Sequence, residues 1–137
     1  MTVLDTSAVL DYLLGDGVAA AVEELLSDNR VGAAPDLMVF EVLAVLRRDV
    51  RRGVIPAERA LGAIEDLGDL PIELYPSLVL RGRAWALREN LTVTDALFVA
   101  LAEQLGEPLA TKDRALASAA RVHASADVIE LTPQRDG

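Results

Sequence analysis

Four acidic residues stand where the surrounding apolar pattern makes a carboxylate unusual. Asp5 follows the apolar run at the start of MTVLDTSAVL, and Asp113 follows the short apolar run of PLATKDRAL. Asp95 opens the helical pattern of TVTDALFVAL, and Glu41 lies inside FEVLAVLRR with apolar neighbours one turn away. Each also has a structural explanation. The three aspartates suit the first turn of a helix, and Glu41 could lie at the edge of its apolar face, paired with an arginine or with water.

Carboxylates gathered in one crevice would form a site for a divalent cation. They repel one another, so each resists ionisation, and a buried carboxylate without a partner is costly. Mg²⁺ prefers oxygen ligands, keeps several waters and takes only a few carboxylates from the protein. The four acids therefore predict a Mg²⁺ site, provided that the fold brings them together.

Short apolar runs alternate with helical patterns along the chain, and this order predicts an α/β fold with a mostly parallel sheet covered on both faces. The predicted strands are residues 3–4, 31–33, 72–75, 109–111 and 128–131. The predicted helices are residues 8–14, 18–26, 35–52, 56–67, 76–90, 94–106 and 114–120. Ser7 and Thr94 are the expected caps of the two helices that follow Asp5 and contain Asp95. In such a sheet the loops after the strands converge on one crevice, where Asp5 and Asp113 would lie.

Size and composition favour a single domain, residues 1–137, with a substantial core. The chain has no cysteine, which excludes disulfides, thiolate nucleophiles and cysteine-bound zinc. It has no apolar run long enough to span a membrane and no basic segment at its start, so we expect a cytoplasmic protein without a membrane partner. The net charge of −9 argues against a general electrostatic grip on nucleic acid, although clustered arginines could still meet phosphates.

The acids and their flanks, in VLDTSAVLDYL, FEVLAVLRR, TVTDALFVALAEQLG and LATKDRAL, resemble those of PIN-domain ribonucleases, and most closely the toxins of VapBC toxin–antitoxin systems. The resemblance covers nearly the whole chain. It implies a Rossmann-like α/β/α sandwich, and a Mg²⁺ or Mn²⁺ site formed by Asp5, Glu41, Asp95 and Asp113. Ser7 is then the small hydroxyl residue that orients a ligand or water, and Thr111 is a second supporting residue.

The same resemblance implies what the protein does and what it binds. The expected activity is metal-assisted hydrolysis of RNA phosphodiester bonds by an endoribonuclease, with no need for a histidine or cysteine nucleophile. The expected partners are the RNA substrate, a small antitoxin that covers an apolar groove and reaches an arginine toward the acids, and a second copy of the chain in a homodimer.

Basic residues gather near the end of the long central helix. Arg47, Arg48, Arg51 and Arg52 form pairs one turn apart and are candidates for contact with RNA phosphates. They would equally complement the carboxyl end of the helix. The only histidine, His123, shows no ligand spacing and is interpreted as structural or exposed, while Trp85 falls in an apolar stripe and is expected in the core.

Three other readings compete with the nuclease. A haloacid-dehalogenase-like phosphatase needs a second aspartate two residues after Asp5, where this chain has Ser7. A phosphoacceptor receiver domain shares an acidic crevice but expects adjacent acids before its first helix and has no use for Glu41. A non-catalytic binding module would use the four acids as helix caps and rim charges. The coincidence of all four acids favours the nuclease.

Overall fold

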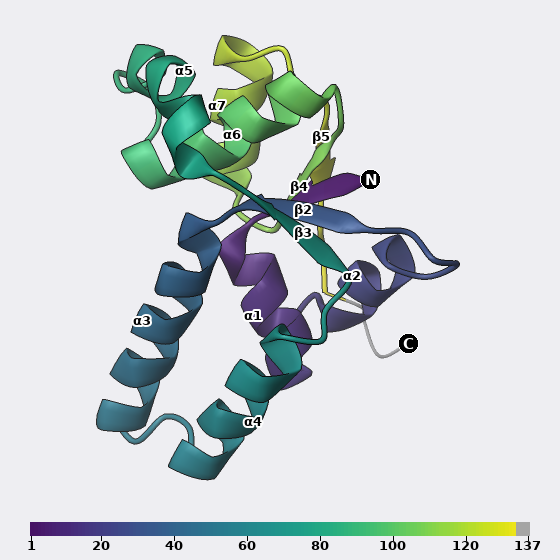
Figure 1. The fold of residues 1–137 in the computed structure, drawn as a ribbon, viewed down its shortest axis with the longest axis vertical. Coiled ribbons are helices and arrows are strands. Elements are labelled where there is room, and N and C mark those ends of the chain that lie inside the picture. The colour runs from purple at the N-terminus through teal and green to yellow at the C-terminus, as the bar shows by residue number, and fades with distance from the viewer. Residues whose placement is uncertain (134–137) are drawn as a thin grey trace.

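The computed structural model describes residues 1–133 and consists of a parallel five-stranded sheet between two layers of helices (Figure 1). The strands are β1 (Thr2–Leu4), β2 (Gly32–Pro35), β3 (Ile72–Tyr75), β4 (Leu109–Thr111) and β5 (Val128–Glu130). The helices are α1 (Thr6–Leu14), α2 (Ala19–Leu25), α3 (Leu37–Arg51), α4 (Ala57–Leu67), the 3₁₀ helix η1 (Ser77–Leu80), α5 (Arg81–Ala86), α6 (Val93–Leu105) and α7 (Arg114–His123). The predicted α/β/α sandwich is confirmed.

The strand order places a crevice at one point of the sheet. The order is β3-β2-β1-β4-β5, with every neighbouring pair parallel. The connections from β1 to β3 carry α1 to α4 on one face, whereas α5, α6 and α7 cover the other (Figure 1). From β1 the chain adds β2 and β3 on one side of the sheet, and later adds β4 and β5 on the other side. The strand order therefore reverses between β1 and β4, which pair through Val3 with Leu109 and Leu4 with Ala110. Parallel sheets bind ligands outside the carboxyl ends of the strands at such a point.

The core lies on both sides of this central strand pair. Val3, Leu4 and Leu109 are fully buried, because helices cover both faces of the sheet. This is why these strands read as continuous apolar runs rather than alternating ones. On α6, Phe98 is the largest fully buried side chain, and its burial contributes about 1.5–3 kcal/mol. Gly106 ends α6 at φ 65°, a left-handed conformation that glycine adopts without steric cost.

The sequence located most elements but misplaced two helix caps and one helix. Asp5, rather than Ser7, caps α1, and Thr92, rather than Thr94, caps α6. The helix predicted over residues 76–90 is η1 followed by α5 and a turn. Its last residues close through bonds that span three residues, such as the N–H of Asn90 to the carbonyl of Leu87 (3.1 Å). Gly82 weakens the helix in this segment.

The placement of Trp85 in the core was wrong. Its side chain is 63% exposed on α5, and the Arg88 guanidinium lies 4.6 Å from the centre of its ring. Leu78 and Val79 of η1 are also exposed, so this part of the molecule presents an apolar surface. His123 is exposed at the end of α7. None of the helices within residues 1–133 has the length and apolar character needed to cross a membrane.

Candidate active site

The four acids singled out in the sequence line one cavity of about 210 Å³ at the crevice between β1 and β4. Asp5 follows β1, Asp113 follows β4, Asp95 lies in the first turn of α6, and Glu41 lies in α3. The rest of this cavity, here called the acidic pocket, is lined by Thr6, Ser7, Leu10, Val45 and Phe98. Segments far apart in the sequence therefore bring four carboxylates to one place.

Asp5 is the most enclosed of the four acids, with 7% of its surface exposed. Its Oδ1 accepts the backbone N–H of Ala8 (3.0 Å) and the hydroxyl of Ser7 (3.1 Å). Its Oδ2 accepts the hydroxyl of Thr111 at 2.5 Å. Burial raises the pKa of Asp5 above its ordinary value, these three donors oppose the rise, and the charge of Asp113 adds to it. Asp5 is thus a helix cap and also a carboxylate of the pocket.

Thr111 connects two of the acids. This fully buried residue ends β4, and while its hydroxyl donates to Asp5, its oxygen accepts the backbone N–H of Asp113 at 3.0 Å. Asp113 in turn caps α7, because its Oδ1 accepts the N–H groups of Ala115 (2.9 Å) and Leu116 (3.1 Å). The cap explanation and the pocket position therefore both hold for Asp113. One of its carboxylate oxygens is held by the helix terminus, while the residue still lines the acidic pocket.

Glu41 is held by a residue that the sequence analysis did not single out. The hydroxyl of Thr6 donates to its Oε1 at 2.6 Å, across 35 positions of sequence. Burial raises the pKa of Glu41, the Thr6 hydrogen bond opposes the rise, and the charges of Asp95 and Asp5 add to it. The only sequence signal for Thr6 was its position directly after Asp5, which does not reveal that α3 packs beside the start of α1.

Asp95 completes the set from the opposite side of the sheet. Its backbone N–H donates to the hydroxyl of Thr92 at 3.2 Å, which fixes the first turn of α6. Burial raises the pKa of Asp95, hydrogen bonding to Thr92 opposes the rise, and the charges of Asp113 and Asp5 add to it. Three of the four acids therefore have raised pKa values, with burial as the main cause and mutual repulsion as a further one.

The acidic pocket has the oxygen ligands that a hard divalent cation prefers, but in this structure hydrogen bonds to protein donors orient its carboxylates. Within residues 1–133, no three acidic or histidine side chains lie close enough together, as they stand, to hold one ion. Asp5, Glu41 and Asp113 instead accept bonds from hydroxyl and backbone groups. The donor set is all oxygen and mainly carboxylate, which fits Mg²⁺ or Mn²⁺. A cation would also relieve the repulsion that raises the pKa values.

The predicted RNA-binding arginines lie away from the acidic pocket. Arg47, Arg48 and Arg51 lie at the distal end of α3, which points away from the sheet, and Arg52 directly follows the helix (Figure 1). At about 1.5 Å per residue, they stand about 9–17 Å along the helix from Glu41. Arg48 donates to Asp49 at 3.2 Å, while Arg47 borders an apolar groove between α3 and α4. They could meet RNA only beyond the pocket itself.

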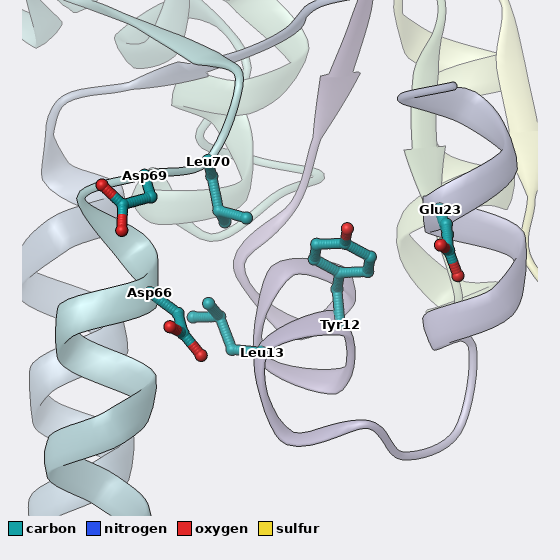
Figure 2. A pocket seen from close by; sticks show the side chains of 6 residues that line it. All are labelled: Tyr12, Leu13, Glu23, Asp66, Asp69 and Leu70. Carbon is teal, nitrogen blue, oxygen red and sulfur yellow. The ribbon is translucent and has the colours of Figure 1, made fainter. Parts of the chain in front are cut away.

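A larger hollow of about 400 Å³ lies between α1, α2 and α4, and its lining includes Glu23, Asp66 and Asp69. Figure 2 shows Glu23 on the far side of Tyr12 from Asp66 and Asp69, so these acids do not converge. Volume alone would favour this hollow as the functional site. The acidic pocket is the stronger candidate, because its carboxylates share hydroxyl partners and perturb one another's pKa values.

Comparisons with known proteins identify the family of the chain. Residues 2–122 match the family described as the PIN domain. The chain is 42% identical over 118 residues to "Ribonuclease VapC1" of Mycobacterium tuberculosis, covering 85% of this chain and 89% of that protein. It is 32% identical over 119 residues to "Ribonuclease VapC3" of Pyrobaculum aerophilum, covering 84% and 91%.

Solved structures show the same fold at lower identity. The crystal structure of PAE2754 from Pyrobaculum aerophilum matches with a TM-score of 0.66 and 21% identity, over 93% of this chain and 81% of that one. The crystal structure of FitAcB from Neisseria gonorrhoeae matches with a TM-score of 0.59 and 17% identity, over 95% and 97%. The match to the family over most of the chain, and the identity to its curated members, show that the chain belongs to the PIN-domain family.

Proposed function

We propose that this chain is an endoribonuclease that depends on Mg²⁺ or Mn²⁺ and acts as the toxin of a VapBC-type toxin–antitoxin pair. The observation that carries the proposal is the convergence of Asp5, Glu41, Asp95 and Asp113 on one pocket, where three of them have raised pKa values. Relatives named VapC ribonucleases, up to 42% identical, support the choice of RNA as substrate.

The four acids are the residues that would hold the cation, one ion or two. When bound, Mg²⁺ or Mn²⁺ lowers the pKa of a coordinated water and stabilises charge on the scissile phosphate. The contribution of the protein is to orient the carboxylate oxygens before a cation binds. Thr111 orients Asp5, Thr6 orients Glu41, and the first turn of α7 orients Asp113. Ser7, which donates to both oxygens of Asp5, supports the same carboxylate.

RNA cleavage with matched variants tests this function. We expect wild-type protein to cut a circular single-stranded RNA with Mg²⁺ or Mn²⁺ and to stop in EDTA; an opened circle shows an internal cut. Asp95→Asn should lower the rate about 100-fold, the scale for loss of one preorganised group that stabilises charge. Asp66→Asn, an acid of the other hollow, is the control and should cleave normally. Equal cleavage by both variants, or cleavage in EDTA, would contradict the proposal.

We further propose that the distal arginines of α3 position the RNA by its phosphates. Arg51 and Arg52 are exposed there, and guanidinium groups bind phosphate in a bidentate manner. Arg48→Glu with Arg52→Glu should weaken RNA binding and make the remaining binding less sensitive to salt. Binding to RNA should be measured with Asp95→Asn as background, so that cleavage does not interfere. Unchanged affinity would rule out this surface.

The antitoxin would cover the apolar groove between α3 and α4. The groove has a cavity of about 390 Å³ and is lined by Leu43, Leu46, Arg47, Val50, Ala57, Ala60, Leu61 and Ile64. Leu43, Leu61 and Ile64 of this lining are 43%, 56% and 37% exposed, so large apolar side chains gather on one face. Leu61→Glu should abolish co-purification with the small antitoxin, while RNA cleavage by the free chain stays unchanged. Retention of the complex would place the partner elsewhere.

We also propose a homodimer, with residues 1–137 as one domain acting in the cytoplasm. The exposed Leu78, Val79 and Trp85 of η1 and α5 are candidates for the contact between copies. Light scattering should give twice the chain mass of 14.6 kDa for the wild type and the mass of one chain for Leu78→Asp. A monomeric wild type would contradict the dimer. Cell fractionation tests the compartment.

A further inference from the structure

One ion pair outside the acidic pocket joins the two segments that carry Asp5 and Asp113. Lys112 Nζ donates to Asp11 Oδ2 at 2.8 Å, across 101 positions of sequence. Lys112 directly precedes Asp113, and Asp11 belongs to α1, the helix that Asp5 caps. The described lining of the acidic pocket includes neither partner. The pair therefore connects the backbone on either side of the pocket without entering it.

The Asp11 carboxylate is a fixed point for this contact. Its Oδ2 also accepts the backbone N–H of Val18 at 3.1 Å, and its side chain is only 15% exposed. Gly17 passes so close that a Cβ there would lie 2.2 Å from the same oxygen. Gly17 also has φ +47°, a conformation that favours glycine. The turn after α1 is thus shaped around Asp11, so Lys112 is tied to a well-ordered partner.

The short segment between β4 and α7 is consequently held from two sides. Thr111 joins it to Asp5 through the hydroxyl that also accepts the N–H of Asp113. Lys112 joins it to α1 through Asp11. Together with the pairing of β1 and β4, these two attachments hold the backbone of Asp113 relative to Asp5. A change at the Lys112 attachment would therefore act on Asp113 without altering the chemical identity of any side chain that lines the pocket.

We propose that Asp11 and Lys112 are positioning residues that set the separation of Asp113 from Asp5, and thereby the affinity of the acidic pocket for a divalent cation. The inference rests on the proposed function, because it requires the pocket to bind such a cation. Neither residue contacts the cation or the RNA. Both act through the backbone of Asp113.

Two substitutions that each remove one charge distinguish positioning from a simple change of electrostatic potential, by the direction in which each changes the affinity for the cation. Lys112→Gln removes a positive charge near the pocket, which by itself would raise the affinity for a cation. Asp11→Asn removes a negative charge, which by itself would lower it. Loss of positioning instead lowers the affinity in both variants. Because both substitutions remove the same ion pair, the double variant should be no worse than either single one.

The test is a titration of wild-type and variant proteins with Mn²⁺ alone, in which free Mn²⁺ is measured by electron paramagnetic resonance. We expect Asp11→Asn and Lys112→Gln each to lower the affinity about tenfold, the lower end of the effect of groups that orient ligands. Lys112→Arg, which can still reach Asp11, should retain it. The control is the Arg83–Glu103 pair, 2.9 Å long with side-chain exposures of 44% and 17%, against 39% and 15% for Lys112 and Asp11. Glu103→Gln should bind Mn²⁺ as the wild type does.

All titrations are made at a temperature where circular dichroism shows each variant folded; if Lys112→Gln does not fold, Lys112→Met, which also removes the positive charge, takes its place. Affinities that move in opposite directions would overturn positioning in favour of a field effect. Affinities that match Glu103→Gln would reduce the pair to an ordinary surface salt bridge. Both results leave the proposed function intact, because the wild type still binds Mn²⁺. A wild type that binds no Mn²⁺ would overturn the proposed function itself, and this inference with it.

Discussion

Replacing Thr111 with valine should destabilise the protein by about 2–3 kcal/mol at neutral pH. Valine has nearly the same volume, so the fully buried site keeps its packing. The loss comes from the hydroxyl. Its bond to the Asp5 carboxylate is of the kind worth about 1.5–3 kcal/mol, and the N–H of Asp113 loses an acceptor at a cost of about 1 kcal/mol. The added methyl group offsets about 0.8 kcal/mol.

The effect should depend on pH, because the Thr111 hydroxyl lowers the pKa of Asp5 in the folded protein. Without the hydroxyl, this pKa rises further, since the bond favours the ionised form. The folded variant then resists loss of the Asp5 proton more strongly than the wild type does. The difference in stability between the two should therefore be small in acid and grow as the pH rises through the pKa of Asp5.

Thermal unfolding in EDTA at several pH values measures this difference. At neutral pH we expect the midpoint of Thr111→Val to fall by about 10 °C for a chain of this size. Thr111→Ser is the control, because it keeps the hydroxyl and loses only a methyl group worth about 1 kcal/mol. The reasoning is refuted if valine costs no more than serine, or if its cost is the same at every pH.

Three further outcomes follow from the hydrogen bonds and the pKa shifts. Thr6→Val should lower RNA cleavage by about tenfold or more with little loss of fold, because Glu41 loses the hydroxyl that orients it, and Thr6→Ser should restore the rate. The wild type in EDTA should lose stability as the pH rises from 4 to 8, because acids with raised pKa values favour the fold while protonated and lose this contribution on ionising. Chemical denaturation at each pH measures this trend, and a stability that does not fall would contradict it. Asp36→Asn should destabilise at pH 7 and progressively less as the pH falls through the lowered pKa of Asp36, because the ionised carboxylate accepts the two bonds of Ser77 more strongly than a neutral carboxyl or amide does. A pH-independent loss in melting experiments would argue against this.

The order of strands and helices was predictable because it rests on local patterns. Apolar runs bounded by turn residues located β1, β3 and β4 closely, and β2 to within two residues at its carboxyl end. The caps were harder, since DTS and TVT each offer several residues able to cap a helix. Asp5 caps α1 because β1 ends at Leu4, which pairs with Ala110, and the chain turns into the helix at once. That choice depends on strand pairing rather than on propensity.

The sequence did not show which hydroxyl group holds which acid, although the family resemblance named Ser7 and Thr111 as supporting residues. Asp5 and Thr111 are 106 positions apart, and Thr6 and Glu41 are 35 apart, so their contacts exist only once helices and strands have packed. Spacing indicated which residues were out of place, whereas the structure shows what holds them. The prediction that Trp85 lies in the core was wrong for a related reason. Its helical spacing is that of a core residue, but the face on which it lies has no described element packed over it.

The most direct test of the central claim, that the acidic pocket is a divalent cation site, is the thermal midpoint of wild type and Asp95→Asn with EDTA and with Mn²⁺. Asp95 is a cleaner position than Asp5, whose two oxygens are both needed as acceptors. The account predicts that Mn²⁺ at 100 times its dissociation constant stabilises the wild type by about 2.7 kcal/mol and the variant far less. In EDTA the variant should be the more stable, because one repulsive charge is gone. An equal response to Mn²⁺ in both proteins, or none in either, would contradict it.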